Sequence, residues 1–287
     1  MTASSIPVAD FGKTGSRVTR VGLGGEGVLR TTGQNLQALD VIETAFDQGI
    51  GYFDSARVYA DSELYLGSFW KGRHVERARM FHTSKSANRT RQGALKDLEQ
   101  SLARLNTDYL DLWQIHDLRT AGDLDAVAAR GGALEAFLEA REKGLVRNIG
   151  VTGHHSPEIL ARAVEMWPVD SVLMPVNPVE EVLGGFLTRT LEAASRKGIA
   201  VIGMKVLGAS HYIAENAGIT PDILIRYALS HDITLVIVGC SSALEVMELV
   251  NSASKPGGMT TEERREIMEL FVPAARKLAF YRGKDSL

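Results

Sequence analysis

Short apolar runs alternate along this chain with segments whose apolar residues recur every three or four positions. A short apolar run is typical of a strand buried on both faces, and the second pattern is typical of an amphipathic helix. The runs predict strands over 19–24, 51–54, 80–85, 109–116, 146–152, 171–176, 200–205 and 234–240. The segments between them predict helices over 35–48, 61–71, 89–105, 132–143, 157–167, 186–197, 220–231 and 242–251.

The even alternation of eight strands with eight helices is typical of a closed barrel. We therefore predict an α/β fold, a (β/α)8 TIM barrel. Two segments lie outside the repeat: "DFGKTGSRV" predicts an N-terminal β-hairpin with Gly15 in its turn, and 260–278 predicts an extra C-terminal helix with a threonine cap. No linker interrupts the pattern, so we expect residues 1–287 to form a single domain.

The composition indicates a soluble globular protein. Of 287 residues, 45% are hydrophobic and 23% are charged, and a formal net charge of −3 gives no reason to expect binding to nucleic acid or to an anionic membrane. No apolar run approaches the roughly 20 residues of a membrane span. A single cysteine, Cys240, excludes an intramolecular disulfide and a thiolate metal cluster, so we expect no metal site and a cytoplasmic location. The oligomeric state is open.

A glycine motif near the N-terminus offers a different interpretation. "GLGGEG" at 22–27 matches the dinucleotide-binding fingerprint of open, doubly wound sheets, and Asp54 ends the next predicted strand. In that fold a helix follows the glycines at once, whereas here the helical pattern begins only near Asn35. The strand–helix pairs also continue past the six strands of such a sheet, and the barrel is therefore favoured.

Four side chains with compatible chemistry fall where barrel enzymes carry their reactive groups, at the C-terminal ends of strands and in the loops that follow. Asp54 ends the second predicted strand, and Tyr59 lies in the loop after it. Lys85 ends the third strand, and His116 ends the fourth. Adjacent strands are about 5 Å apart, so we expect these four side chains to meet in one pocket.

Together the four side chains suit the reduction of a carbonyl by hydride, which creates negative charge on oxygen. Tyr59 would give the proton, because a neighbouring ammonium, Lys85, stabilises a phenolate and lowers the pKa of the phenol. Asp54 would keep Lys85 protonated and oriented. His116 would hydrogen-bond the substrate oxygen beside Tyr59.

Four successive segments carry a family resemblance: "GYFDSARVYADSELYLG", "FHTSK", "LDLWQIH" and "RNIGVTGH". The chain resembles the aldo-keto reductase superfamily over about residues 10–255, and its "MK" followed by a Leu-Gly turn on the seventh strand is most similar to the bacterial branch. The resemblance implies a barrel enzyme that reduces a small aldehyde or ketone with NADP(H). It also implies that Tyr59 is the general acid.

The resemblance also implies a set of cofactor-binding positions. These are Gly25, Thr152, Gly153, Asn177, Met204, Lys205, Val206, Leu207, Gly208, Gly239, Cys240, Ser241, Glu245 and Glu248. Thr152-Gly153 stands where relatives have a Ser-Asn pair, so one amide contact is missing or comes from His154 or the backbone. Asn177 is the nearest substitute for the family's strand-six glutamine. Met204 aligns with a stacking tyrosine, although packing in the barrel core is an equal alternative.

The remaining assignments concern the phosphates and the substrate. Residues 205–208 lie where the pyrophosphate would run, and 240–242 would offer backbone donors at a helix N-terminus. We interpret Cys240 as buried packing, without a reactive thiol. Glu26 is expected to line the substrate pocket; Trp113 either faces the substrate or packs in the core.

One departure bears on the choice of cofactor. Many relatives carry a basic residue that pairs with the 2′-phosphate of NADP, and Glu245 occupies the aligned position. A carboxylate there repels a phosphate, so NAD(H) is an alternative cofactor. Glu248 could still hydrogen-bond the adenine.

Two other functions remain open from the sequence alone. Some barrels of this kind act as cofactor-binding, redox-sensing regulators with little turnover. A lyase or isomerase with a Schiff base on Lys85 is the other, although Asp54 beside the lysine argues that the amine stays charged. The substrate itself is not predicted, and the polar, alanine-rich segment 117–132 is the main candidate for a lid.

Overall fold

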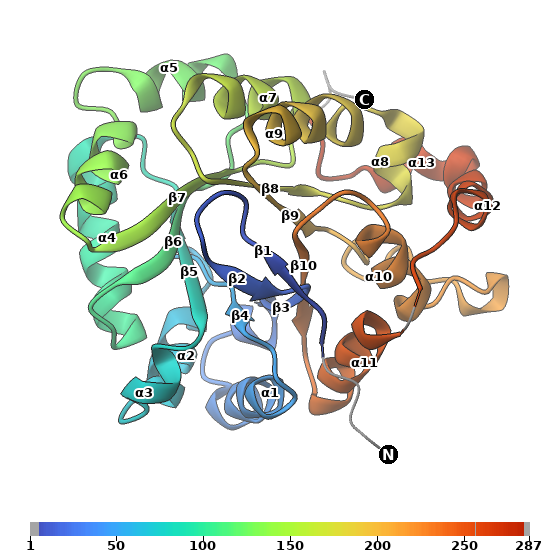
Figure 1. Cartoon of the computed structure of the whole chain (residues 1–287), viewed down its shortest axis with the longest axis horizontal. Coiled ribbons are helices and arrows are strands. Elements are labelled where there is room, and N and C mark those ends of the chain that lie inside the picture. The colour runs from blue at the N-terminus through green and yellow to red at the C-terminus, as the bar shows by residue number, and fades with distance from the viewer. Residues whose placement is uncertain (1–5, 256, 284–287) are drawn as a thin grey trace.

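In a computed structural model that describes residues 6–255 and 257–283, eight parallel strands close into a barrel with helices around it (Figure 1). The strands pair in the order β10-β3-β4-β5-β6-β7-β8-β9. They are β3 (Val21–Gly27), β4 (Tyr52–Phe53), β5 (Phe81–Ser86), β6 (Leu110–Ile115), β7 (Val146–Thr152), β8 (Ser171–Pro175), β9 (Ala200–Met204) and β10 (Leu235–Cys240). The predicted (β/α)8 barrel is confirmed, with a strand at each predicted position.

The helices lie outside the barrel (Figure 1). They are α1 (Asn35–Asp47), α2 (Ser62–Trp70), α3 (His74–Arg77), α4 (Arg91–Leu105), α5 (Ala121–Ala128), α6 (Ala133–Glu142), α7 (Pro157–Met166), α8 (Pro178–Leu183), α9 (Leu191–Lys197), α10 (Pro221–Leu229), α11 (Ala243–Ser254), α12 (Thr261–Phe271) and α13 (Ala275–Leu278). Short turns of other helix types are η1 (Val28–Arg30), η2 (Phe186–Thr190), η3 (Glu215–Ala217) and η4 (Val272–Ala274). In 6–255 and 257–283 no helix is long and apolar enough to cross a membrane.

The structure departs from the predicted helices in several places. Helix α3 was not predicted, and the helix predicted over 186–197 is divided into η2 and α9. The expected C-terminal helix is divided into α12, η4 and α13, because Pro273 lies in η4 and a proline lacks the N–H that a continuing helix needs. The segment 117–132 is not an open loop, since it contains α5. Thr120 caps that helix reciprocally with Asp123. Helix α8 was not predicted either; it begins after the Asn177 cap with a proline in its first turn.

The N-terminal hairpin closes one end of the barrel. Strands β1 (Val8–Asp10) and β2 (Arg17–Thr19) pair antiparallel, and Gly15 in the turn between them has a φ of 78°, as the predicted hairpin requires. Phe11 packs on Phe81, the first residue of β5, with 4.6 Å between ring centroids. The hairpin therefore packs into the N-terminal end of the barrel, and the predicted catalytic residues lie toward the opposite end.

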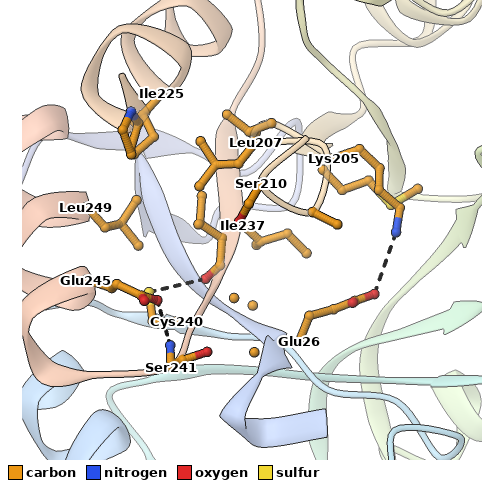
Figure 2. A pocket seen from close by; sticks show the side chains of 18 of the residues that line it. Glu26, Lys205, Leu207, Ser210, Ile225, Ile237, Cys240, Ser241, Glu245 and Leu249 are labelled. Atoms are coloured by element: carbon orange, nitrogen blue, oxygen red, sulfur yellow. Dashed lines mark hydrogen bonds and ion pairs between the residues drawn. The ribbon is translucent and has the colours of Figure 1, made fainter. Parts of the chain in front are cut away.

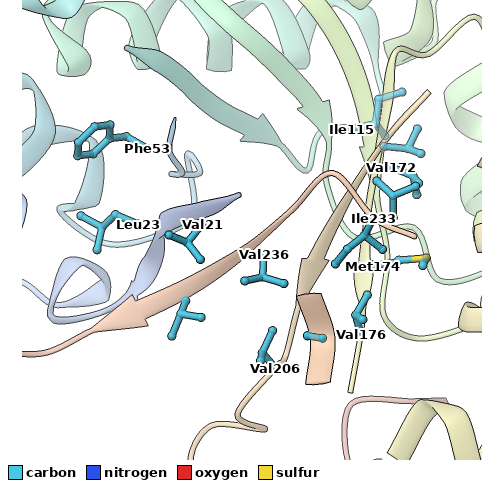
Figure 3. Close-up of a cluster of buried hydrophobic side chains, with 14 of the residues drawn as sticks. Val21, Leu23, Phe53, Ile115, Val172, Met174, Val176, Val206, Ile233 and Val236 are labelled. Atoms are coloured by element: carbon cyan, nitrogen blue, oxygen red, sulfur yellow. The ribbon is translucent and has the colours of Figure 1, made fainter. Parts of the chain in front are cut away.

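Two apolar layers hold the strands in place. One fills the barrel interior and includes Tyr52, Leu112, Ile202 and Leu235. The other lies between the strands and the helices, and Figure 3 shows part of it, including Val21, Leu23, Phe53, Ile115, Val172 and Val236. Because strand residues alternate between these layers, the next inward-facing positions toward the C-terminal end carry the polar side chains of the site.

Candidate active site

A buried ion pair joins the ends of β4 and β5. Lys85 Nζ donates to Asp54 Oδ2 at 2.6 Å and to the carbonyl of Ser55 at 2.7 Å. Thr83 Oγ1 donates to the other carboxylate oxygen at 2.9 Å. The exposed fractions of the Lys85 and Asp54 side chains are 0% and 1%. Burial lowers the pKa of Lys85 from its usual value, while Asp54 raises it and so favours the ammonium.

Tyr59 and His116 meet beside this pair. A turn places Tyr59, whose backbone N–H donates to the carbonyl of Ala56 at 3.0 Å. The rings of Tyr59 and His116 meet edge to face, with centroids 5.5 Å apart, and Lys85 Nζ lies 4.9 Å from the centroid of the Tyr59 ring. The four side chains predicted from the sequence to share one pocket therefore lie together.

The pKa of Tyr59 differs from the expectation. Burial raises the pKa of this phenol well above its usual value, and the carboxylates of Asp54 and Glu26 raise it further. The cation that lowers it is Arg30, whose guanidinium carbon lies 4.9 Å from the centroid of the Tyr59 ring. We predicted that Lys85 lowers this pKa. The pKa is raised overall, so that prediction is wrong, and Tyr59 carries its proton at neutral pH.

His116 is neutral at physiological pH. Burial, followed by the charge of Lys85, lowers the pKa of His116 to about 3. Its Nδ1 atom is buried and has no hydrogen-bond partner among the described residues. Arg89, which sequence reasoning missed, donates to the backbone carbonyls of His116 at 2.8 Å and Asp117 at 2.7 Å and ties this corner to α5 through Asp123.

A cavity of about 500 Å³ opens beside these side chains. It is lined by most of the predicted cofactor residues, by the predicted substrate residue Glu26 (Figure 2), and by two of the four predicted catalytic residues. Those predicted residues are Gly25, Glu26, Asp54, Tyr59, Met204, Lys205, Val206, Leu207, Gly208, Gly239, Cys240, Ser241, Glu245 and Glu248. The lining residues that were not predicted are Gly24, Gly27, Leu173, Ala209, Ser210, Ile213, Pro221, Ile225, Ile237, Val238 and Leu249.

Glycines let the strands around the cavity approach one another closely. A Cβ at Gly25 would lie 2.8 Å from Cδ2 of Tyr59, and one at Gly239 would lie 2.6 Å from the backbone of Glu26. Both distances are too short for a side chain, so the "GLGGEG" motif serves the packing of β3 against β10 and Tyr59. It opens no helix of the kind that the dinucleotide fingerprint requires.

Four of the predicted cofactor and substrate residues do not line the cavity, and of the predicted catalytic residues Lys85 and His116 lie outside its lining. Thr152 is buried and its hydroxyl accepts from the N–H of Asp117 at 2.8 Å, and Gly153 lies next to it. Asn177 is buried too, as the cap of α8. Trp113 is 0% exposed and stacks on Phe137 of α6, with centroids 3.6 Å apart. Of the two interpretations of Trp113, core packing agrees with the structure, whereas contact with substrate does not.

Carboxylates outnumber cations along the cavity. Lys205 is the single lysine or arginine among the described lining residues, and its Nζ lies 3.6 Å from Oε1 of Glu26 (Figure 2). Arg30 donates to the same oxygen at 2.9 Å. Glu245 and Glu248 line the cavity as well. A polyanionic ligand would therefore meet one cation that is already paired.

Glu245 occupies the end of the cavity at α11. Its Oε2 accepts from the backbone N–H of Ser241 at 2.7 Å (Figure 2), and Ser242 caps the same helix. The donor at which an anion would bind is thus used by the chain's own carboxylate. Burial raises the pKa of Cys240 to about 12, so this thiol stays protonated and unreactive, as predicted. No cluster of metal-ligating side chains is found within 6–255 and 257–283.

Comparisons with known proteins agree with this geometry. The sequence profile of the Aldo/keto reductase family matches residues 20–216. An L-galactose dehydrogenase from Arabidopsis thaliana is 25% identical, with 94% of this chain and 96% of that protein aligned. Methylglyoxal reductase DkgB from Salmonella typhi is 27% identical over 69% of each chain. The holo form of aldo-keto reductase AKR11C1 from Bacillus halodurans superposes with a TM-score of 0.75 at 21% identity, covering 92% of this chain and 96% of that one, and shares the fold.

Proposed function

Because this chain belongs to the aldo/keto reductase family, we propose that it reduces an aldehyde or ketone to an alcohol, with hydride from a nicotinamide cofactor and a proton from Tyr59. The observation that carries the proposal is the buried Lys85–Asp54 pair beside Tyr59, at the edge of a cavity of about 500 Å³. A cavity of this size is within the range of small-molecule and cofactor sites. Its glycine-lined wall and the left-handed backbone of its rim leave room for a flat ring close to the main chain.

Each catalytic residue has a separate role at the substrate oxygen. When bound, the nicotinamide supplies the hydride. Tyr59 and the neutral imidazole of His116 both donate hydrogen bonds to the carbonyl oxygen, and so they orient the substrate. As negative charge grows on that oxygen, Tyr59 releases its proton to it, because an alkoxide is a stronger base than a phenolate. Lys85 then stabilises the phenolate, and Asp54 holds the ammonium in place.

The charges at the two ends of the cavity favour NADH over NADPH. Glu245 covers the Ser241 N–H where a 2′-phosphate would bind, and the described lining residues offer no arginine or second lysine to compensate. A 2′-hydroxyl, by contrast, can donate to a carboxylate, as it does to the acidic residue of NAD-binding folds. The cavity thus suits the dinucleotide with less negative charge.

The test is a binding and turnover assay on the purified chain. Quenching of protein fluorescence by NADH and by NADPH gives two dissociation constants, and a panel of aldehydes, ketones, aldoses and methylglyoxal gives turnover with each cofactor. We expect binding of NADH to be tighter and at least one carbonyl to be reduced. Binding without oxidation of the cofactor across the panel would instead favour a redox-sensing role, and trapping of substrate on Lys85 by borohydride would favour Schiff-base chemistry.

A further inference from the structure

The loop that follows β9 (residues 205–213, the β9 loop) has an unusual backbone. Lys205, Ala209 and Ser210 have φ angles of 55°, 51° and 69°, a left-handed region that side chains disfavour. Most of the loop lines the cavity. Residues in such conformations persist only where the surroundings hold them, so the source of that support bears on the site.

Two buried side chains hold the backbone of this loop, one from within it (Tyr212) and one from outside it (Asn177). The ring of Tyr212 lies against Gly208, where a Cβ would come within 2.5 Å of Cε1 of that ring. Asn177 Nδ2 donates to the backbone carbonyl of Lys205 at 3.1 Å. The exposed fractions of Tyr212 and Asn177 are 2% and 0%, so neither contact is shared with solvent.

Both supports converge on one hydroxyl near the C-terminus. The second N–H of the Asn177 amide donates to Tyr281 Oη at 3.0 Å, and Tyr212 Oη lies 3.3 Å from the same atom and 3.2 Å from the Leu278 carbonyl. Tyr281 in turn donates to Oε1 of Glu180 at 2.8 Å, and Arg282 pairs with that carboxylate. Burial raises the pKa of Tyr281 well above its usual value, so this hydroxyl keeps its proton.

We propose that Tyr281 is a positioning residue for cofactor binding, because its hydroxyl fixes Asn177 and Tyr212 and, through them, the β9 loop at Lys205 and Gly208. Tyr281 does not line the cavity, so its effect is indirect. The proposal rests on the proposed function, since it takes the β9 loop as the wall against which the dinucleotide binds. Without the hydroxyl, a smaller fraction of molecules would have the β9 loop in its binding-competent conformation. The apparent affinity for the cofactor would fall in proportion to that fraction.

The test is the Tyr281→Phe variant, which removes one oxygen and keeps the ring. We expect the dissociation constant of NADH to rise by about 3- to 10-fold, the range of a single lost hydrogen bond, while kcat at saturating cofactor stays within about 2-fold. Tyr212→Phe should weaken binding similarly. The double variant should weaken binding by less than the product of the two single effects, because the two hydroxyls contact each other.

Hydrogen exchange gives a readout that does not depend on turnover. Amides of the β9 loop should exchange faster in Tyr281→Phe than in the wild-type protein without cofactor. Tyr227→Phe is the matched control, because its hydroxyl donates to Glu181, which lies outside the loop. This control should keep wild-type cofactor affinity even where it lowers the melting temperature.

The outcomes separate the role of Tyr281 from the proposed function. An unchanged dissociation constant in Tyr281→Phe, or an equal weakening in Tyr227→Phe, would overturn the positioning role while wild-type binding still supports a cofactor site. If the wild-type protein bound neither dinucleotide, the proposed function itself would be overturned.

Discussion

Replacing Asp54 with asparagine keeps the shape of the side chain and removes the negative charge beside Lys85. The ammonium is 0% exposed, so water cannot take over the role of the carboxylate. Breaking a buried pair by removing one partner typically costs about 3–5 kcal/mol. Lys85 keeps its hydrogen bond to the Ser55 carbonyl at 2.7 Å, so we expect a loss near the lower end, about 3 kcal/mol at pH 7.

The pH dependence of that loss follows from the pKa of Lys85. Without Asp54, burial is opposed only by the carboxylates of Glu26 and Glu63, so the folded-state pKa of Lys85 falls further while the unfolded value stays near 10.4. The unfolded chain then binds more protons than the folded one, so the stability of Asp54→Asn rises with pH between these two values. The deficit relative to wild type should therefore shrink from pH 7 to about pH 9.

Urea denaturation of four proteins measures this: wild type, Asp54→Asn, Lys85→Met and the double variant. The double variant leaves no unpaired charge, so its loss of unfolding free energy should fall short of the sum of the single losses by about 2 kcal/mol or more. A loss below about 1 kcal/mol in Asp54→Asn, or additive losses in the double variant, would refute a tightly coupled buried pair.

The remaining predictions concern the cofactor and the proton donor. Glu245→Arg replaces repulsion with attraction at the end of α11, so the ratio of kcat/KM with NADPH to that with NADH should rise at least about 10-fold; an unchanged ratio would mean that this side chain does not meet the ribose. Because burial raises the pKa of Tyr59 and lowers that of His116 to about 3, the rate of reduction should be flat from about pH 6 to about pH 9 and fall only as Tyr59 loses its proton at higher pH. A fall in the rate of reduction with an apparent pKa between about 7 and 9 would contradict the assignment of Tyr59 as the proton donor.

The barrel and the four clustered side chains could be predicted because each depends on local patterns. Every strand has its own apolar run, and the rule that barrel sites lie at strand ends selects Asp54, Tyr59, Lys85 and His116 without any knowledge of packing. Short helices are harder to detect, since α5 and α8 have too few apolar positions to show a period. Their caps were visible, in Thr120 with Asp123 and in Asn177 followed by proline, and are the signal that was overlooked.

What depends on distant parts of the chain could not be read from the sequence. The raised pKa of Tyr59 comes from burial beneath residues of several strands, and the cation over its ring, Arg30, lies 29 positions away along the chain. Asn177 was expected to contact the cofactor because amides suit that task. Its partner Tyr281 is 104 positions away, and nothing local to Asn177 indicates that its amide is used to hold the β9 loop.

The most direct test of the central claim is the Tyr59→Phe variant, in single-turnover reduction of the best substrate from the panel. Removing the phenol oxygen takes away the only proton donor assigned to the reaction and leaves the cofactor end of the cavity intact. We predict that the rate of hydride transfer falls by about 10² to 10⁴-fold while the dissociation constant of the cofactor changes by less than about 3-fold. A variant that still reduces the carbonyl at close to the wild-type rate would contradict the account.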